Sequence, residues 1–428
     1  MSQKFISMET FVGAGGSYLG LKKAGFKTVY VNEIDKNFAE TLIHNNKKDL
    51  KDCLIDIKPI EEIDFKNVRN KLNLKKKVVD LIFGGPVCKG YSLAGVRDPS
   101  DTRNTLYRHQ LRMISEFLPK ISIIENVPAM RTSLILKSGI EKNKLKEISY
   151  VWKQLDIFKG MKAKLTKEGK KLSKKELADY NLIKDKKKKF EKFVKDNSLS
   201  VIDDIKLSLE NLGYTVYVEN LNAAWFGSFT KRIRTFVVAV RKDLNKDFKF
   251  PTITNFNFKD KLNGFNIVKN PKPFRTIKDA FNELDYKGKN SPKNDSDNIP
   301  MNHNEKSVER FKLIPKGKNI VDVMNTVPKH LKISKFYSRG CTMRLDDNIP
   351  APTLVPGHSN FPVHPHEHRS ISVREAAQIT GFPSNYKFFG NHTKRCEQVG
   401  NAVPILLANA LASQCKKILE WKKIYKGI

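Results

Sequence analysis

The feature that most constrains the fold is an alternation of short apolar runs with helical stretches over residues 4–126. The runs are rich in Val, Ile, Phe and Tyr, as is typical of buried strands: FISMETFV, KTVYVNE, CLIDI, VVDLIFGG and ISIIENV. Helices are expected between them, for example over 17–25, 35–46 and 103–118. This alternation predicts an α/β fold in which a parallel sheet carries helices on both faces. Ligands of such sheets bind beyond the carboxyl ends of the strands, so polar residues there are the first candidates for a functional site.

Later segments depart from this pattern. Residues 142–195 hold 19 Lys, 7 Asp or Glu and no Pro, which indicates a solvated helical insertion; contact with DNA and a free solvated arm both remain open. The runs TVYVENLNA and RTFVVAV extend the sheet. Residues 251–365 are rich in Asn, Pro, Gly and Lys with weak periodicity, so we expect a separate, irregular small domain. Helices over 372–380 and 402–424 close the chain.

The charge of the chain favours a polyanionic partner. The 428 residues carry a formal net charge of +34, and 39% of them are apolar, enough for a large domain and a smaller one. Nucleic acid is the usual partner of a protein with such a positive electrostatic field. Lysines spread evenly over the whole solvated surface would, however, give the same net charge. Five scattered Cys without a CxxC pair indicate neither a zinc site nor a disulfide framework. Neither a signal peptide nor a membrane span is expected, and a reducing, cytoplasmic setting follows.

The first expected strand runs into a glycine-rich loop. Gly13, Gly15 and Gly16 let a ligand approach the backbone between a strand and a helix. Glu33 ends the second strand, where a carboxylate typically binds the ribose hydroxyls of a nucleoside cofactor. The dinucleotide fingerprint would need a third glycine where Tyr18 stands. A tight turn without a ligand is the alternative.

Reactive side chains follow the fourth and fifth strands. Cys88 lies in the loop GGPVCKGYS beside Lys89, and positive potential there lowers the pKa of a thiol, although a lone cysteine is more often a small buried hydrophobe. Glu125 ends the next strand, so thiol and carboxyl are expected to face one pocket. Arg232 and Arg234 alternate, so both point to one side of an extended segment. Two cations there suit a polar base or a phosphate, or form a salt-bridged surface.

In order and along nearly the whole chain, these segments resemble the cytosine-5 DNA methyltransferase family. FVGAGGSYLGLKKAGF is similar to its cofactor loop, GGPVCKGYS to its nucleophile motif and ENV to its Glu-Asn-Val motif. LNAAWFG followed by KRIR, then SVREAAQITGFP and QVGNAVP, are similar to its later motifs. The insertion 142–195 and most of 251–350 lie outside the resemblance. It implies a Rossmann-like sheet of the S-adenosylmethionine-dependent methyltransferases with a smaller irregular target-recognition domain.

The resemblance assigns roles by position. The implied contacts to S-adenosyl-L-methionine are Phe11, Gly13, Gly15, Gly16, Glu33, Ile34, Asp56, Ile57, Pro86, Leu106, Asn401 and Ala402. The implied catalytic residues are Cys88 as nucleophile, Glu125 as the acid at cytosine N3, and Arg234, with Arg232 beside it, as a donor to cytosine O2. The implied DNA contacts are Lys89, Ser92, Arg103 and Thr353.

Four positions depart from the family pattern. Val87 stands where Pro usually precedes the nucleophile, which leaves the loop less rigid by one fixed φ. Lys89 and Thr230 replace two Gln residues, and Asn104 follows Arg103 where Gly is usual. None of these changes removes a group that the chemistry needs.

The resemblance implies methyl transfer from S-adenosyl-L-methionine to C5 of cytosine in a specific double-stranded DNA sequence, through a covalent bond from Cys88 to C6 of a flipped base. The implied division is a catalytic and cofactor-binding domain over 1–250, a target-recognition domain over 251–365, and a return to the catalytic domain over 366–428. We expect a monomer without a metal, which serves as the methylase of a restriction–modification system whose endonuclease would act separately. Candidate base readers are Asn304, Arg310, Arg339, Arg344, His358 and Asn360.

Three other functions fit parts of the sequence. An RNA cytosine-5 methyltransferase acting on transfer RNA would share the motifs, but the size of 251–365 and the absence of a Cys-Phe-Thr motif favour DNA. A nicotinamide oxidoreductase would share the sheet, but Tyr18 and the pair Cys88 and Glu125 argue against it. A DNA-binding relative without activity is disfavoured because both of these reactive residues are intact.

Overall fold

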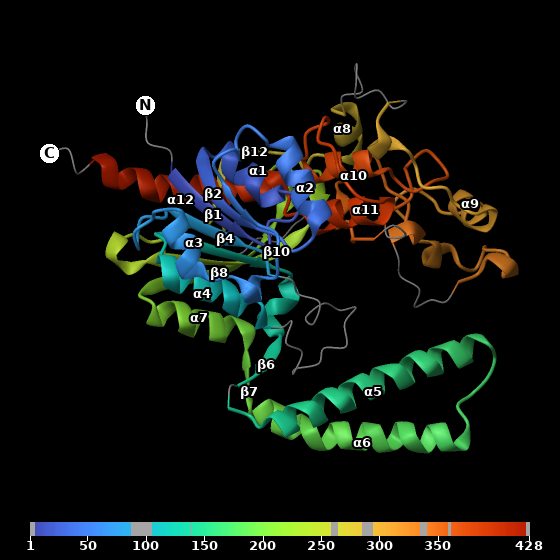
Figure 1. Ribbon diagram of the computed structural model, residues 1–428. Coiled ribbons are helices and arrows are strands. Elements are labelled where there is room, and N and C mark those ends of the chain that lie inside the picture. Colours follow the sequence, from blue (N-terminus) through green and yellow to red (C-terminus); the bar gives the residue numbers. More distant parts are fainter. Residues whose placement is uncertain are drawn as a thin grey trace.

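A computed structural model describes residues 5–86, 105–137, 139–257, 264–284, 294–333, 340–357 and 361–424 (Figure 1). Its centre is a seven-stranded sheet with the order β3-β2-β1-β4-β5-β10-β8. The strands are β1 (Phe5–Thr10), β2 (Phe26–Asn32), β3 (Leu54–Asp56), β4 (Leu81–Gly84), β5 (Ile121–Asn126), β8 (Tyr214–Asn222) and β10 (Ile233–Arg241). Strands β1 to β5 pair in parallel, as the sequence predicts, and β10 alone runs antiparallel to its two neighbours β5 and β8.

The register of these strands brings distant parts of the chain to one edge. Thr10 of β1 pairs with Gly84 of β4, and Gly84 pairs with Ile124 of β5, so the carboxyl ends of these three strands are level. Because β10 is antiparallel, its beginning reaches the same edge, where Thr235 pairs with Asn126. The strand order also reverses between β1 and β4, which is the position where open α/β sheets hold their ligands.

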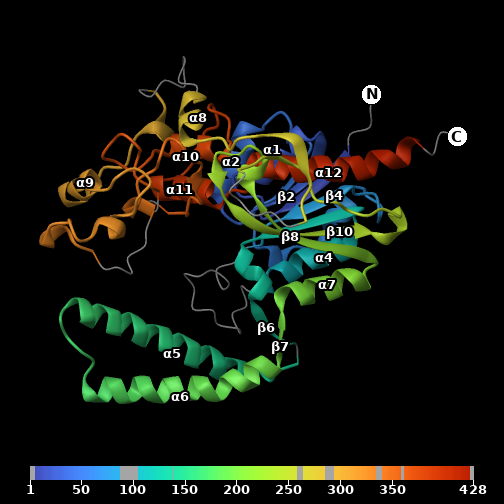
Figure 2. The same cartoon turned by 180° about the vertical axis from the view of Figure 1, so that it is seen from behind.

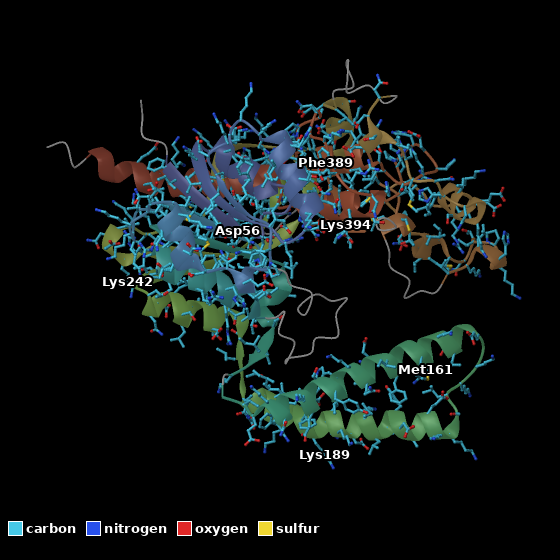
Figure 3. All side chains as sticks on the ribbon, viewed as in Figure 1. Asp56, Met161, Lys189, Lys242, Phe389 and Lys394 are labelled. Atoms are coloured by element: carbon cyan, nitrogen blue, oxygen red, sulfur yellow. The ribbon has the colours of Figure 1, made fainter. Side chains whose placement is uncertain are left out.

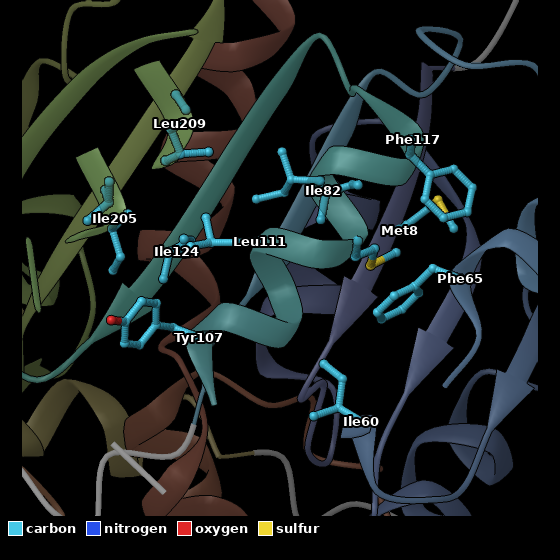
Figure 4. Packing of buried hydrophobic residues seen from close by; sticks show 14 of the residues in the cluster. Met8, Ile60, Phe65, Ile82, Tyr107, Leu111, Phe117, Ile124, Ile205 and Leu209 are labelled. Atoms are coloured by element: carbon cyan, nitrogen blue, oxygen red, sulfur yellow. The ribbon is translucent and has the colours of Figure 1, made fainter. Parts of the chain in front are cut away.

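Alternate side chains of the strands pack against helices on opposite faces of the sheet. The helices around the sheet are α1 (Gly16–Lys23), α2 (Lys36–Asn45), α3 (Phe65–Lys71), α4 (Tyr107–Phe117), α7 (Val201–Asn211) and α12 (Ile405–Ile424). Ile82 belongs to the core shared with α3, α4 and α7, where Phe117 and Leu209 are also buried (Figure 4). The next residue, Phe83, faces α1 and α12. Each such side chain stabilises the fold by roughly 1.5–3 kcal/mol.

The helix predicted over 402–424 begins later than expected. Helix α11 (His392–Asn401) ends first, and α12 starts at Ile405. Pro404 cannot donate a backbone hydrogen bond, so a continuous helix is broken there, and its carbonyl oxygen instead accepts the first helical bond, from Ala408, at 3.0 Å. Helices α7 and α11 were not predicted from the sequence.

The C-terminal part of the chain is irregular, as expected for 251–365. Its regular elements are β9 (Thr230–Lys231), β11 (Ile253–Asn255), β12 (Ile267–Lys272), β13 (Ala351–Pro352), α8 (Ile277–Asn282), α9 (Glu305–Lys312) and α10 (Val373–Thr380). Ile277 and Phe361 share a core with α10, α11 and Ala14 of the first loop. Phe311, Ile320 and other residues form a second, smaller core. The segment therefore has one part packed on the sheet and one part with a core of its own.

The segment 142–195 forms a helical hairpin, as expected, which we call the arm. It consists of α5 (Lys142–Lys167) and α6 (Lys174–Asp196), mounted on the two-stranded ladder of β6 (Leu134–Leu136) and β7 (Ser198–Ser200). The arm projects from the rest of the molecule in both views (Figures 1 and 2). Trp152, Ile183 and other apolar residues form a separate cluster between the two helices. No helix among the described residues is long and apolar enough to cross a membrane.

Candidate active site

Glu125, near the end of β5, lies directly against the loop that follows β4. Its Oε2 atom is 2.9 Å from the position that a Cβ atom of Gly85 would occupy, so a side chain at position 85 would displace this carboxyl group. Asn126 donates from Nδ2 to the carbonyl oxygen of Pro86 at 3.0 Å. The predicted residues Cys88, Lys89, Ser92 and Arg103, which follow in this loop, lie outside the described residues.

The two arginines of the basic motif are buried at the same edge. Arg234 Nε lies 3.1 Å from Glu125 Oε1, and Arg234 Nη1 donates to the carbonyl oxygen of Ile233 at 2.7 Å. Arg232 instead donates to the carbonyl oxygens of Leu354 and Asn401, at 3.2 and 3.3 Å. Thus Arg234 faces the reactive carboxyl group, whereas Arg232 ties the strand to two segments that return from later in the chain.

The carboxyl group of Glu125 is held in a state that favours its neutral form. Burial is the largest influence and raises its pKa above the ordinary value, because a charge in the protein interior loses its hydration. The positive charges of Arg234 and Arg232, with the hydrogen bond from Arg234, oppose this shift without cancelling it. A buried carboxylic acid beside a fixed cation can donate a proton or a hydrogen bond at neutral pH.

Glu33 joins the ends of β1 and β2. Its Oε2 accepts from the backbone N–H of Gly13 at 2.8 Å, and its Oε1 accepts from those of Ile34 and Asp35, both at 2.9 Å. Burial raises the pKa of this carboxyl group, and the three backbone donors oppose the shift. Oε2 accepts only one of these bonds and has further acceptor capacity, so Glu33 can shape the loop and still accept from a ligand hydroxyl.

The glycine-rich loop has the backbone conformations expected of a ligand cradle. Gly13 and Gly15 have positive φ angles, and so does Phe11, at 54°, which is uncommon for a residue with a large side chain. A Cβ atom on Gly16 would lie 2.4 Å from the carbonyl oxygen of Val403 and 3.1 Å from Cβ of Ala402. The absence of a side chain at Gly16 therefore lets the C-terminal segment pack against the loop.

Two exposed apolar side chains lie beside this carboxylate. Ile34 is 62% exposed and Ile57 is 41% exposed, and they lie just beyond the ends of strands β2 and β3. Asp56 is the last residue of β3, where its Oδ2 accepts from the Tyr30 hydroxyl at 3.0 Å and its carbonyl oxygen accepts from the Glu33 N–H. Apolar surface flanked by carboxylates fits a nucleoside, whose base needs apolar contact and whose ribose needs acceptors.

The remaining predicted residues are distributed around the same edge. Leu106 is half-buried and packs on the core beneath α4, while Asn401 and Ala402 connect Arg232 with the glycine-rich loop. Thr353 donates to the carbonyl oxygen of Lys231 at 3.3 Å, because β13 pairs with β9. The structure thus brings residues from the first, middle and last parts of the chain to one side of the sheet.

Gly85 and Asn126 were not assigned roles by the sequence analysis, although both contact the reactive loop or its carboxyl group. The sequence did contain a signal for a role in the site, because each residue stands at the carboxyl end of a buried strand and inside one of the motifs named above. What the sequence could not supply was the distance between the two strand ends.

One candidate base reader has a structural role instead. The buried guanidinium of Arg344 donates to the carbonyl oxygens of Phe311, Ile314, His364 and Glu367 and contacts His368, which engages all five of its N–H groups. The expectation that it reads bases is therefore wrong. Asn304 caps α9, and Arg310 donates to the carbonyl oxygen of Leu331. Arg339, His358 and Asn360 lie outside the described residues.

Comparison with known proteins places this geometry in a family. Residues 5–159 and 182–417 match the model of the C-5 cytosine-specific DNA methylases. The chain is similar to the Type II methyltransferase M.FnuDI of Fusobacterium nucleatum (28% identity, covering 98% of this chain and 97% of that protein) and to M.NgoPII of Neisseria gonorrhoeae (28%, covering 97% and 96%). A putative DNA modification methyltransferase encoded within an Escherichia coli prophage shares the fold, with a TM-score of 0.60 at 20% identity over 97% of this chain and 99% of that one.

Proposed function

Because this chain belongs to the C-5 cytosine-specific DNA methylase family and is a DNA cytosine-5 methyltransferase, we propose that it uses S-adenosyl-L-methionine and the thiol of Cys88 to methylate a specific sequence in duplex DNA. The observation that supports this mechanism is the convergence of Glu125, Arg234 and the loop after β4 at one edge of the sheet. Cys88 is two residues beyond Pro86, whose carbonyl oxygen Asn126 holds.

The proposed chemistry follows from the low nucleophilicity of cytosine C5. Attack of the Cys88 thiolate on C6 breaks the aromaticity of the ring and turns C5 into an enamine carbon that can take a methyl group from S-adenosyl-L-methionine. Loss of the C5 proton to solvent then breaks the bond between Cys88 and C6, which restores the aromatic ring and the free thiolate. Charge develops on the ring during this attack, and the neutral carboxyl group of Glu125 can donate to N3. Arg234, which holds Glu125, has further N–H donors for O2 of the base. The base must first leave the duplex, which costs a few kcal/mol.

The residues at the ends of β1, β2 and β3 fit S-adenosyl-L-methionine. Ile34 and Ile57 offer apolar surface to an adenine ring, Glu33 and Asp56 offer acceptors, and Gly13 leaves open space beside its backbone for a methionine moiety. When bound, this cofactor supplies an electrophilic methyl group. The chain contributes its orientation, because Glu33 fixes the loop and the next strand relative to each other.

The small domain is the proposed reader of the target sequence. Residues 251–365 lack the strand–helix alternation of the core, and their smaller hydrophobic cluster can present loops to DNA independently of the sheet. The relatives named above are Type II methyltransferases. We therefore propose that this enzyme is the monomeric methylase of a restriction–modification system, paired with an endonuclease that acts separately.

The test is methylation of duplex DNA by the purified protein with radiolabelled S-adenosyl-L-methionine, followed by bisulfite sequencing. The wild-type protein is expected to mark cytosine within one short sequence and to leave transfer RNA unlabelled. Cys88→Ser is expected to abolish transfer but not DNA binding, since an alcohol is almost never ionised at neutral pH. The control Cys341→Ser, in the small domain, should remain active. Turnover by Cys88→Ser, or transfer to RNA in place of DNA, would refute the proposal.

A further inference from the structure

The arm concentrates positive charge, and its far end lies outside the segments that match the family model. Its segment 142–195 holds 19 Lys against 7 acidic residues, about a third of the net charge of the protein in an eighth of its length. The family match is interrupted at residues 160–181, which are the far end of the arm. Its hydrophobic cluster is internal, apart from Leu136 at its base. The arm therefore has a hydrophobic cluster of its own, separate from the cores around the sheet.

The lysines of the arm fall into two structural classes. Lys144, Lys162 and Lys187 lie over aromatic rings within the arm, with their Nζ atoms 4.7, 5.7 and 5.2 Å from the ring centroids of Phe190, Tyr180 and Trp152. These lysines stabilise the hairpin itself. A second class is exposed on the outer faces of the two helices, where solvent or a partner must balance the charge.

One outer face of α5 has a regular composition. Positions 146, 150, 153, 157, 160 and 164 follow at intervals of three or four residues, so they form one stripe along the helix. The stripe carries the exposed residues Lys146, Lys153 and Lys164, with Tyr150 and Ile157 between them, each 56% exposed. It lies opposite the face of α5 that packs on α6 through Val151 and Leu155. Cations interleaved with an aromatic and an aliphatic side chain are typical of a surface that contacts the phosphates and sugars of nucleic acid.

The stripe faces the part of the molecule that acts on DNA. In both views α5 lies between α6 and the body of the protein, and the arm extends beneath the small domain that carries α9 (Figures 1 and 2). Side chains of α5 and α6 lie between the two helices of the hairpin (Figure 3). Lys189 lies on α6, which is the helix farther from the rest of the protein (Figure 3). The face of α5 that is turned away from α6 is consequently turned toward the small domain and the catalytic edge.

We propose that this stripe, formed by Lys146, Tyr150, Lys153, Ile157 and Lys164, binds the sugar–phosphate backbone of the substrate duplex outside the bases that are read. The proposal rests on the proposed function, since it requires duplex DNA between the arm and the small domain. Helix α5 has 26 residues and is about 39 Å long, comparable to the roughly 34 Å of one turn of B-DNA. The arm therefore spans enough duplex to neutralise several phosphates without touching the base edges.

The experiment compares two faces of the same arm in the full-length protein. The test variant is Lys146→Gln/Lys153→Gln/Lys164→Gln, and the matched control is Lys174→Gln/Lys188→Gln/Lys192→Gln, which removes three charges from the outer face of α6. Glutamine preserves length and helix propensity, and circular dichroism checks that both variants keep their helical content. The measurement is the dissociation constant for a fluorescent mixed-sequence duplex of about 30 base pairs over a range of KCl concentrations.

The expected result is a shallower salt dependence for the α5 variant alone. Each phosphate that is no longer neutralised reduces the slope of log affinity against log salt by about 0.9, so the triple substitution would change it by up to about 2.7. An unchanged slope for the α5 variant, or equal changes in both variants, would overturn the assignment of the DNA-binding face. A lower mass of the α5 variant in sedimentation would instead identify the stripe as a contact between two copies. If the wild-type protein fails to bind the duplex, the proposed function itself fails.

Discussion

The catalytic edge and the arm use charged residues in opposite ways. At the edge, Glu125 and Glu33 are buried, and each has a partner from a distant part of the chain, Arg234 for Glu125 and Gly13 for Glu33. In the arm, the ion pairs are local, for example Lys187 with Glu191 at 3.3 Å, one helical turn apart in α6. At the catalytic edge, single ionisable groups are positioned by the packing of distant segments. In the arm, many charged residues lie on the surface of two helices that form from local sequence.

This difference determines how each region responds to substitution. A buried carboxyl group without its solvent shell interacts strongly with its neighbours, so replacing one atom changes its chemistry. An exposed ion pair contributes at most about 1 kcal/mol, because water and salt screen it. We therefore expect single substitutions to have large effects at the edge, and only the summed charge to matter in the arm.

The largest effect is expected for Glu125→Gln. The change keeps the shape of the side chain but removes the acid that donates to the ring, and loss of one such stabilising group typically lowers kcat by about 10²–10³. The measurement is the single-turnover rate of methyl transfer to duplex DNA, together with the affinity for the same DNA.

The control for this prediction is Glu219→Gln. Glu219 also pairs with an arginine, Arg131, at 3.4 Å, but the pair is exposed, so its loss should leave the rate within about a factor of two. Equal rate losses in the two variants would show that Glu125 acts only through the stability of the fold.

A smaller effect is expected for Glu33→Ala, and on a different step. This substitution removes the acceptor proposed for the ribose and releases the three backbone donors of the loop. The affinity for S-adenosyl-L-methionine should fall about 10–100-fold, as for loss of a hydrogen bond to a charged group, while DNA affinity changes little. Separate titrations of cofactor and DNA measure this split. Glu40→Ala, on the exposed side of α2, is the control, and a parallel loss of both affinities in Glu33→Ala would contradict the assignment.

The sequence predicted the parts of the edge that depend on chain order. The alternation of strands and helices placed Gly13, Glu33 and Glu125 at strand ends, and the structure puts them there. It could not predict that Arg232 donates to the carbonyl oxygens of Leu354 and Asn401, because these hydrogen bonds depend on how the last segments return to the sheet. The pairing of β13 with β9 could not be predicted either, because it joins residues that are far apart in the sequence.

Arg344 illustrates why composition alone failed in the small domain. An arginine in a polar, irregular segment has the donors of a base reader, but its use is decided by burial, which local sequence does not encode where periodicity is weak. In the arm, by contrast, local sequence is sufficient to predict the structure. Its helices follow from local propensity and from Ser173, whose side chain accepts from the N–H of Glu176 while the Glu176 carboxylate accepts from that of Ser173.

Glu9, buried near the end of β1, is expected to affect the stability of the fold. Burial raises the pKa of its carboxyl group from 4.5 to about 8, and the hydroxyls of Ser17 and Thr28 only partly oppose this shift. The group stays protonated in the folded protein while it ionises in the unfolded chain, so its contribution to stability is lost as pH rises from about 4.5 to 8. The loss amounts to at most about 1.4 kcal/mol per pH unit, or tenfold in the folding equilibrium.

Glu9→Gln removes this titration. The difference in unfolding free energy between variant and wild-type protein should therefore shift in favour of the variant as pH rises from about 5 to 7.5, as measured by urea denaturation. Glu176→Gln in the arm provides the contrast, because this surface carboxylate has a lowered pKa owing to its bonds with Ser173. A pH-independent difference for Glu9→Gln would show that its carboxyl group ionises normally in the folded state.

Removal of the whole arm is expected to have the smallest effect on catalysis, although it is the largest change to the sequence. Lys137 N–H donates to the carbonyl oxygen of Asn197 at 2.9 Å, which closes the base of the hairpin. Deleting residues 140–196 and joining Gly139 to Asn197 leaves β6 and β7 connected by a short loop of the length that β-hairpins use. The catalytic core loses no partner of Glu125 or Glu33, so the rate of methyl transfer at saturating DNA should stay within about twofold.

The deletion should nevertheless change how the enzyme holds DNA. Without the arm, the slope of log affinity against log salt should become shallower, by about 0.9 for each phosphate that the arm no longer neutralises. The methylated sequence should stay the same, because interactions with phosphates position a protein on DNA and interactions with bases specify the site. Bisulfite sequencing and salt titration of the deletion variant measure these two properties separately. An altered target sequence, or a tenfold loss of rate in a variant with normal stability, would mean that the arm belongs to the catalytic or recognition machinery and that the two regions are not independent.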